Sequence, residues 1–465
     1  MSSITVEYSS KSEVNSSTSI HYSETSDFAK PSIGRTLESF STHNAKVTEA
    51  YVEEKEYSIY IPNKVLSVLT THVSKKKLKV IHQDNKTAIE ICLLFLSNLA
   101  NAYYNGNEHN WKRLNAKKLR AQLRIGRDQT IYKRVIELLS SADLTENGPM
   151  IEMDGGFVQG IKSSGYKLTE KYNSKGVRQY HLKTEIVRFM RKRSVVTFRE
   201  EVAKNEIVQN LNQFYKNIEL PSIEEIIAEG RKLSKEGYRT KKGKLLTMRN
   251  KNGLHRWKNP QDRVFIEDHI RMYKRLTKDG FILPMPSEGA AGGRVIDSLN
   301  LMPSWIRKMI KIDGQRLEEI DFKALHPNIA IAIYGGTSSF LTHDQVAEET
   351  GLSKDKVKKL HLSFFNHEIE NVYHSPLFAY YQEKEPEMLS LMLRDKAANG
   401  YTATTTRMFQ KEVEIMTKVI RKLNSEGIYV GYVFDALICK PEHRGYVKQV
   451  MNSEVYKCGV RTIAE

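Results

Sequence analysis

Cysteine is scarce in this chain of 465 residues. The three cysteines, Cys92, Cys439 and Cys458, are an odd number at wide spacing, and no Cys-x-x-Cys pair is present. Disulfide frameworks need an even set of cysteines, and structural zinc sites need closely paired ones. The sequence therefore predicts neither, which fits a protein of the reducing cytoplasm.

Long apolar runs are also missing. The longest run, from Ile89 to Ala100, is interrupted by Glu90 and Asn98, whereas a helix that crosses a bilayer needs ~20 apolar residues. The first residues carry no basic segment followed by an apolar one, so a secretory signal is not expected. We therefore expect neither a membrane protein nor a secreted one.

Two common catalytic signatures are absent as well. The 14 histidines never form His-x-x-x-His or His-Glu-x-x-His, so zinc-hydrolase chemistry has no support. No Gly-x-x-x-x-Gly-Lys-Ser/Thr is present, which leaves a P-loop ATPase unsupported.

Positive charge is what the chain has in excess. Lys and Arg number 72 against 55 Asp and Glu, a net charge of +17, and this balance favours a polyanionic partner. The segment from Arg231 to Lys258 is the most basic and also holds Tyr238 and Trp257. Cations that pair with phosphate, and rings that cover sugar or base, suit a nucleic-acid groove; the alternative is a merely soluble basic protein. The candidate DNA-binding residues of this segment are Lys241, Lys242 and Lys244.

The chain is long enough for two or three domains, and 40% of its residues are hydrophobic, enough for real cores. Residues 1–45 hold 13 Ser and 5 Thr with little periodicity, which predicts a disordered leader. Residues 176–280 read as helical and basic.

Residues 80–175 read as one unit. Asn115 can cap a short helix that runs through Leu123, a turn follows, and a second helix is expected over 129–141. Glycine-punctuated segments after it predict a β-ribbon. This order is typical of a winged helix-turn-helix, whose second helix enters the major groove of DNA; a winged helix used only for protein contact is the alternative. The candidate DNA contacts are Arg127, Lys133 and Arg134.

Two aspartates in the C-terminal third carry the strongest chemical signal. Asp321 ends the apolar segment Leu317–Asp321, and Asp435 lies at the centre of a predicted β-hairpin over 427–440. Two carboxylates on neighbouring strands of one sheet can jointly hold two Mg²⁺ ions, which activate a 3′-hydroxyl and stabilise leaving pyrophosphate. An aspartate within an apolar hairpin is hard to dismiss as a turn former, since a buried unpaired charge is costly.

At these residues the chain resembles the palm of family A (DNA polymerase I-like) nucleic-acid polymerases. Asp321-Phe-Lys-Ala-Leu-His-Pro is similar to that family's motif A, and Val433-Phe-Asp435-Ala-Leu to its motif C. The similar segments span roughly 280–465 and are recognisable as an ordered set, because no single motif would suffice.

The resemblance implies roles for further residues. The segment before motif A, the helix before motif C and a fingers helix at Lys354–Asn366 all have counterparts here. By this resemblance Asp321 and Asp435 are the catalytic metal ligands. The primer–template contacts are Arg294, Arg307, Arg407 and Gln410. The nucleotide-binding residues are Lys358, Lys359, Phe364, Phe365 and His326.

The chain also departs from the family pattern. Ala436 stands where the family has a glutamate after the motif C aspartate, so two aspartates must suffice. His326 stands where the family usually has a glutamate beside the sugar 2′ position, and the His-Pro pair is partly reminiscent of family B. The segment between the aspartates is short, which implies reduced fingers. No proofreading exonuclease signature is found.

We therefore predict an α+β polymerase palm with an antiparallel sheet, with small helical fingers, at 281–465. It follows a thumb-like region at 176–280 and a winged helix at 80–175. The predicted function is two-metal primer extension, with Mg²⁺ (Mn²⁺ being possible), in replication of a phage, plasmid or similar element. The partners would be primer–template, nucleoside triphosphates and duplex DNA. The alternatives are a replication initiator with an inactive palm and a single-subunit RNA polymerase or primase.

Overall fold

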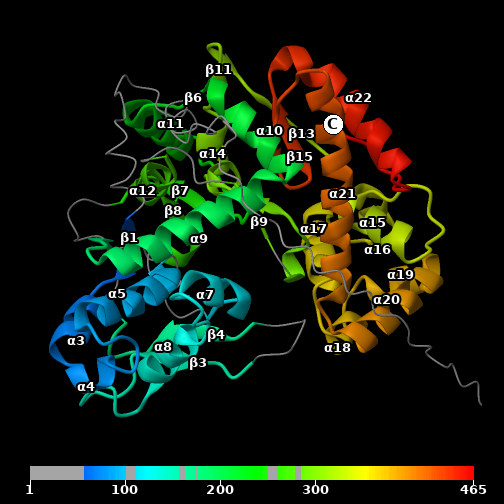
Figure 1. The fold of residues 1–465 in the computed structure, drawn as a ribbon. Helices are drawn as coiled ribbons and strands as arrows, with labels where there is room; N and C mark the ends of the chain where they lie inside the picture. The colour runs from blue at the N-terminus through cyan, green and yellow to red at the C-terminus, as the bar shows by residue number, and fades with distance from the viewer. Residues whose placement is uncertain are drawn as a thin grey trace, which may run out of the picture.

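The structure is a computed structural model that describes residues 57–100, 111–156, 163–173, 176–249, 259–277, 284–287 and 289–465. The predicted leader at 1–45 and residues 250–258 of the basic segment, Trp257 among them, lie outside the described residues. Within the described residues the protein is mixed α+β, mostly helical, with small and mainly antiparallel sheets (Figure 1). None of the described helices combines the length and apolar character that a bilayer crossing needs.

A first hydrophobic core joins residues from Ile59 to Met190. Its most buried element is α5 (Asn85–Leu96). Strand β1 (Ser58–Pro62) pairs with β5 (Val177–His181), so this core takes in residues beyond both ends of the predicted range 80–175. The other elements are α3 (Val65–Thr71), α4 (Lys75–Leu78), η1 (Ser97–Leu99), β2 (Lys112–Arg113), α7 (Ala116–Gln122), α8 (Ile131–Ser140), β3 (Ile151–Met153) and β4 (Gly165–Leu168).

The predicted order of elements is present in this core. Asn115 caps α7 as expected, because its side chain accepts from the backbone N–H groups of Lys117 and Lys118. Helix α8 buries Ile131, Val135 and Leu139. Strands β3 and β4 follow it and form a three-stranded sheet, in the order β2-β4-β3, with β2 from before α7. Residues 157–162, where part of the ribbon was expected, lie outside the described residues.

Glu90, which interrupts the longest apolar run, has a structural explanation. Its buried carboxylate accepts from the backbone N–H groups of Lys183 and Thr184, at 2.7 and 2.8 Å, and from the Thr184 and Tyr180 hydroxyls. Lys183 and Thr184 immediately precede α9 (Glu185–Ala203), so the carboxylate lies at the N-terminal end of the helix, where the helix dipole favours negative charge. The acid in the apolar run therefore links α5 to the start of α9.

Helix α9 connects the first core to a second one, since it contributes Met190 to the first and Val202 to the second. The second core extends to Ala464 and draws residues from both the predicted thumb-like range and the predicted palm. Its elements before the central sheet are α10 (Glu206–Phe214), η2 (Tyr215–Asn217), β6 (Ile218–Glu219), α11 (Ile223–Lys235), β7 (Leu245–Thr247), η3 (Pro260–Asp262), β8 (Arg263–Phe265), α12 (Ile266–Thr277), β9 (Met285–Pro286), η4 (Gly289–Ala291), β10 (Val295–Ile296), α13 (Ser298–Leu301), α14 (Ser304–Arg307), β11 (Lys311–Ile312) and β12 (Gln315–Arg316).

The central sheet has the strand order β13-β15-β14, all antiparallel. Strands β13 (Glu318–Asp321), β14 (Gly431–Val433) and β15 (Ala436–Cys439) confirm the predicted strand and the predicted hairpin. The long helix α21 (Ala403–Ser425) packs against both α15 (Leu325–Ile333) and α22 (Arg444–Lys457), the last helix of the chain (Figure 1).

Helix α15 begins at Leu325, four residues after Asp321. Pro327 therefore lies in the first turn of the helix, where its missing N–H costs nothing. The remaining helices between the two aspartates are α16 (His343–Thr350), α17 (Lys354–Phe364), α18 (Ile369–Tyr373), α19 (Phe378–Lys384) and α20 (Pro386–Asn399), and η5 (Pro441–His443) precedes α22.

Candidate active site

The strand register brings the two predicted aspartates together. Asp321, the last residue of β13, lies directly opposite Ala436, the first residue of β15. Asp435 is the residue before Ala436, in the two-residue turn that joins β14 to β15. Cα atoms of directly paired antiparallel residues are ~5 Å apart, so two carboxylates from segments more than a hundred residues apart meet at one end of the sheet.

The proximity of the two carboxylates changes how they ionise. Crowding by the surrounding protein, and then the negative charge of Asp435, raise the pKa of Asp321 to about 7, although Lys241 acts in the opposite direction. Because the Asp321 side chain is exposed at the rim of a recess, like-charge repulsion by Asp435 is the main physical reason for the raised pKa. Burial and the neighbouring Glu412 raise the pKa of Asp435 as well. The two groups titrate as a pair.

The backbone is strained next to both aspartates. Phe434, which precedes Asp435, has a φ of 59°, and Ala324, three residues after Asp321, has a φ of 46°. This left-handed region is the one that tight hairpin turns require and that glycine or asparagine usually fills; a bulky residue there costs ~1–3 kcal/mol. Phe434 is held by packing, because its ring lies against the Arg294 guanidinium, 4.9 Å from the ring centre.

Behind Asp435 lies a buried ion pair that the sequence did not reveal. Glu412 on α21 has no exposed side-chain surface and receives two hydrogen bonds from Arg294, one of them at 2.8 Å. His326 Nε2 lies 2.7 Å from Glu412 Oε2, so the Nε2–H tautomer donates to the carboxylate. Burial alone would raise the pKa of Glu412, but these two partners outweigh it and hold the pKa below its usual value.

The approach of Arg294 to α21 depends on a glycine. Gly292 has a φ of +64°, and a Cβ atom there would lie 2.5 Å from the Cβ of Phe409 and 2.8 Å from the backbone nitrogen of Gln410. Only glycine tolerates both the conformation and this contact. The guanidinium of Arg294 then covers the Phe409 ring at 3.5 Å, which fixes a predicted primer–template residue beside the aspartates.

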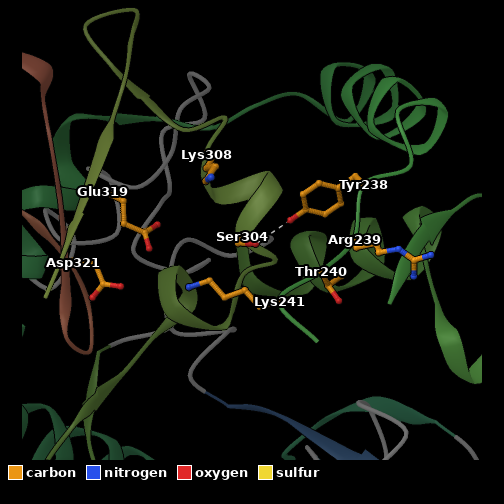
Figure 2. Close-up of a pocket in the computed structure, with 8 residues that line it drawn as sticks. All are labelled: Tyr238, Arg239, Thr240, Lys241, Ser304, Lys308, Glu319 and Asp321. Atoms are coloured by element: carbon orange, nitrogen blue, oxygen red, sulfur yellow. Dashed lines mark hydrogen bonds between the residues drawn. The ribbon is translucent and has the colours of Figure 1, made fainter. Parts of the chain in front are cut away.

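A recess opens on the other flank of the pair, beside Asp321. It has a volume of about 360 Å³ and is lined by residues of the segment after α11, of α14 and of β13. Figure 2 shows the Lys241 amine and the Asp321 carboxylate both directed into this space. The complete lining is Tyr238, Arg239, Thr240, Lys241, Ser304, Lys308, Glu319 and Asp321.

The other predicted primer–template residues are engaged within the protein or exposed. Arg307 is buried and donates to Glu319 Oε2 at 3.3 Å. Arg407 is exposed and makes two hydrogen bonds to Asp395, at 2.7 and 2.9 Å. Gln410 is exposed on α21. Their roles on nucleic acid stay predictions.

The predicted nucleotide-binding residues of α17 differ in exposure. Lys358 and Lys359 are exposed. Phe364 and Phe365 are buried, with 0% and 1% of their surface exposed, in an aromatic cluster with Tyr381 and His361. In the described conformation neither ring is available to stack on a base, because both fill the core between α17 and α19.

The predicted DNA contacts of the first core also differ in exposure and in their partners within the protein. Arg127 and Lys133 are exposed, whereas Arg134 forms an ion pair with Asp128 and donates to the Val80 carbonyl at 3.1 Å. Of the basic segment, Lys241 lines the recess, Lys242 is exposed and Lys244 is half-buried.

The site is suited to a hard cation through two carboxylates only. Within the described part of the chain, no three His, Cys, Asp or Glu side chains are grouped so as to hold a metal ion. Mg²⁺ is usually bound by one or two carboxylates with water and substrate phosphates, so the pair of Asp321 and Asp435 fits this donor set. Burial and nearby negative charge both raise the pKa of these carboxyls, and a bound cation would offset the negative charge.

One signal in the sequence could have identified Glu412. It lies at helical spacing among the apolar residues Met408, Ile415 and Val419 of the buried face of α21. A buried acid on an apolar face requires a cationic partner, and the identity of that partner could not be read from spacing.

Comparisons with known proteins add little. No protein-family model and no curated protein matches the chain. Among solved structures 46 chains match. One is the POL domain of Pol1 from M. smegmatis in complex with DNA primer-template and dNTP, at 11% identity and a TM-score of 0.37, covering 62% of this chain and 76% of that one. A likeness this low supports no argument about function, so the proposals below depend on this chain's own residues.

The raised pKa of Asp321 predicts how the stability of the folded protein depends on pH. The pKa of this carboxyl is about 7 in the native state and ~4 in the unfolded state. The folded protein therefore loses stability as the pH rises from ~4 toward 7. In EDTA at pH 8, Asp321→Asn should therefore raise the melting temperature by a few degrees, because the amide removes one of two repelling charges. The gain should shrink at pH 5, measured by thermal unfolding; a variant less stable than wild type at pH 8 would contradict it.

Proposed function

We propose that this chain is a template-dependent nucleic-acid polymerase, of the DNA-directed DNA polymerase type, that extends a primer 3′-hydroxyl. The observation that carries the proposal is the register that sets Asp321, at the end of β13, beside Asp435, in the turn that leads into β15. Two neighbouring carboxylates cost stability, and carboxyls with perturbed pKa values cluster at functional sites. A polymerase with two such carboxylates and an excess of basic residues suits replication of a phage, plasmid or similar element.

The two aspartates would hold the catalytic cations. Two Mg²⁺ ions, or Mn²⁺, bound by Asp321 and Asp435 would lower the pKa of the 3′-hydroxyl and stabilise the leaving pyrophosphate. The protein itself contributes position, since phosphoryl transfer needs little covalent chemistry from side chains. The antiparallel pairing of β13 with β15 fixes the carboxylates relative to each other before any substrate binds.

Arg294 and His326 would position the substrates beside the metals. Glu412 neutralises part of the Arg294 charge and restrains both side chains. His326 is 20% exposed, so part of its ring faces outward beside Asp435. We propose that this surface lies against C2′ of the incoming nucleotide, where an imidazole would clash with a 2′-hydroxyl.

We also propose that the first core is a winged helix that binds duplex DNA. Its support is the order of α7, α8, β3 and β4, together with exposed Arg127 and Lys133 at the turn and on α8. Arg134 would instead stabilise the motif through Asp128 and Val80.

Removing either carboxylate tests the catalytic proposal. Asp321→Asn and Asp435→Asn should each lower nucleotide incorporation by about three orders of magnitude or more, since the amide keeps the shape and loses the charge that holds the cations. The dissociation constant for primer–template should change little. Gel-resolved primer extension and fluorescence anisotropy measure the two quantities.

The matched control is Asp313→Asn, which changes an exposed carboxylate in the turn between β11 and β12 and should leave incorporation near wild type. Substantial incorporation by either variant of the pair would exclude the proposed metal ligands.

Sugar selection is tested at His326. His326→Ala should raise ribonucleotide incorporation relative to deoxynucleotide, because it removes the bulk against C2′; a discrimination of ~2.7 kcal/mol corresponds to about a hundredfold ratio of kcat/KM. His326→Gln keeps volume and a hydrogen-bond donor for Glu412, so it should retain most of the discrimination. If the wild type accepts both sugars equally, the RNA polymerase alternative gains support.

The winged-helix role is tested by exposed residues alone. Arg127→Ala combined with Lys133→Ala should weaken duplex binding about equally across sequences and lower the slope of log K against log salt by ~2, since each cation releases about one counterion. Primer extension on a supplied template should persist. An unchanged slope would leave this core with a scaffold role.

A further inference from the structure

We propose that the recess beside Asp321 binds the phosphates at the 3′ end of the primer strand, with Lys241 and Lys308 as the residues that hold them. This inference rests on the polymerase function proposed above, and it places the primer strand of the nucleic acid on one flank of the aspartate pair. No motif of the sequence pointed to Lys308, and Lys241 was predicted only as part of a general basic segment.

The lining has the chemistry of a phosphate site. Lys241, Lys308 and Arg239 supply positive charge, and Ser304, Thr240 and Tyr238 supply hydroxyl groups. Of the two acids, Glu319 is partly neutralised by Arg307 at 3.3 Å, and Asp321 is the proposed cation ligand. A volume of about 360 Å³ is within the range of small-ligand pockets.

The backbone around Lys241 is held by hydrogen bonds, whereas its side-chain amine is not. Thr240 and Gly243 close a tight turn around it, with backbone hydrogen bonds from Gly243 N to Thr240 O at 2.8 Å and from Thr240 N to Lys244 O at 2.9 Å. Within the described residues, neither the Lys241 nor the Lys308 amine has a hydrogen bond or ion pair to protein. Two amines that line one recess and make no hydrogen bond or ion pair within the described residues suit an anion that arrives from outside.

The position of the recess favours the primer over the triphosphate. Asp435 faces Glu412, Arg294 and His326, on the side of α21 and α15. The predicted triphosphate lysines lie on α17, whose C-terminal end is tied to α20 and α21 through Lys396 and Thr405. The recess instead lies between three elements: the segment that follows α11, the helix α14 and the strand β13. Because the predicted triphosphate lysines of α17 are not part of the recess lining, we assign the recess to the primer.

Equilibrium binding in EDTA tests the inference separately from catalysis. Lys241→Ala and Lys308→Ala should each weaken primer–template binding about tenfold at moderate salt, and each should lower the salt slope by ~1. Lys241→Arg should restore binding. The matched control is Lys448→Ala, an exposed lysine on α22, which should leave the dissociation constant unchanged.

A modified primer locates the contact. A methylphosphonate at the last or next-to-last linkage removes the charge of one phosphate. Wild type should lose affinity for this primer, whereas Lys241→Ala, which already lacks the contact, should lose little further affinity. Equal losses in both proteins, or a Lys241→Ala effect confined to KM for the nucleotide, would overturn the inference. If the wild type binds primers in this manner yet never extends them, the recess assignment stands and the polymerase proposal fails.

Discussion

The pairing of β13 with β15 is the constraint on which the rest of the site depends. It sets the end of one strand beside the turn of a hairpin that lies more than a hundred residues later. The two carboxylates meet there. Crowding and the charge of Asp435 raise the pKa of Asp321, and burial with the charge of Glu412 raises the pKa of Asp435. Every other feature of the site either supports this arrangement or offsets its cost.

Two groups of residues, one on each flank of the aspartate pair, surround the carboxylates. On the Asp435 side, a buried carboxylate fixes Arg294 and His326, and Gly292 allows the close approach that this requires. On the Asp321 side, a tight turn presents Lys241 to an open recess. The strained backbone at Phe434 and Ala324 lies within three residues of the aspartates, as is usual where geometry is preserved for function. An acidic centre between two cationic flanks is an arrangement suited to two phosphate-bearing substrates.

Local patterns predicted the strands and the hairpin of the central sheet, because alternating apolar residues and turn signals are local properties. They also predicted the Asn115 cap, and motif order predicted both aspartates. Three features could not be predicted, because they depend on contacts between distant segments. The pairing of β1 with β5 extends the first core, the burial of Phe364 and Phe365 follows from packing against α19, and the partners of Glu412 come from two other segments. Charge alone could not distinguish Arg134, which is internally paired, from exposed Lys133.

The central claim is that the paired aspartates catalyse template-directed nucleotide addition. The most direct measurement is extension of a labelled primer on a defined template by the unmodified protein, with one nucleotide supplied at a time, in Mg²⁺ or in EDTA. The account predicts addition only of the nucleotide complementary to the template, only when Mg²⁺ is present. No addition with any deoxynucleotide or ribonucleotide, or addition that persists in EDTA or ignores the template, would contradict it.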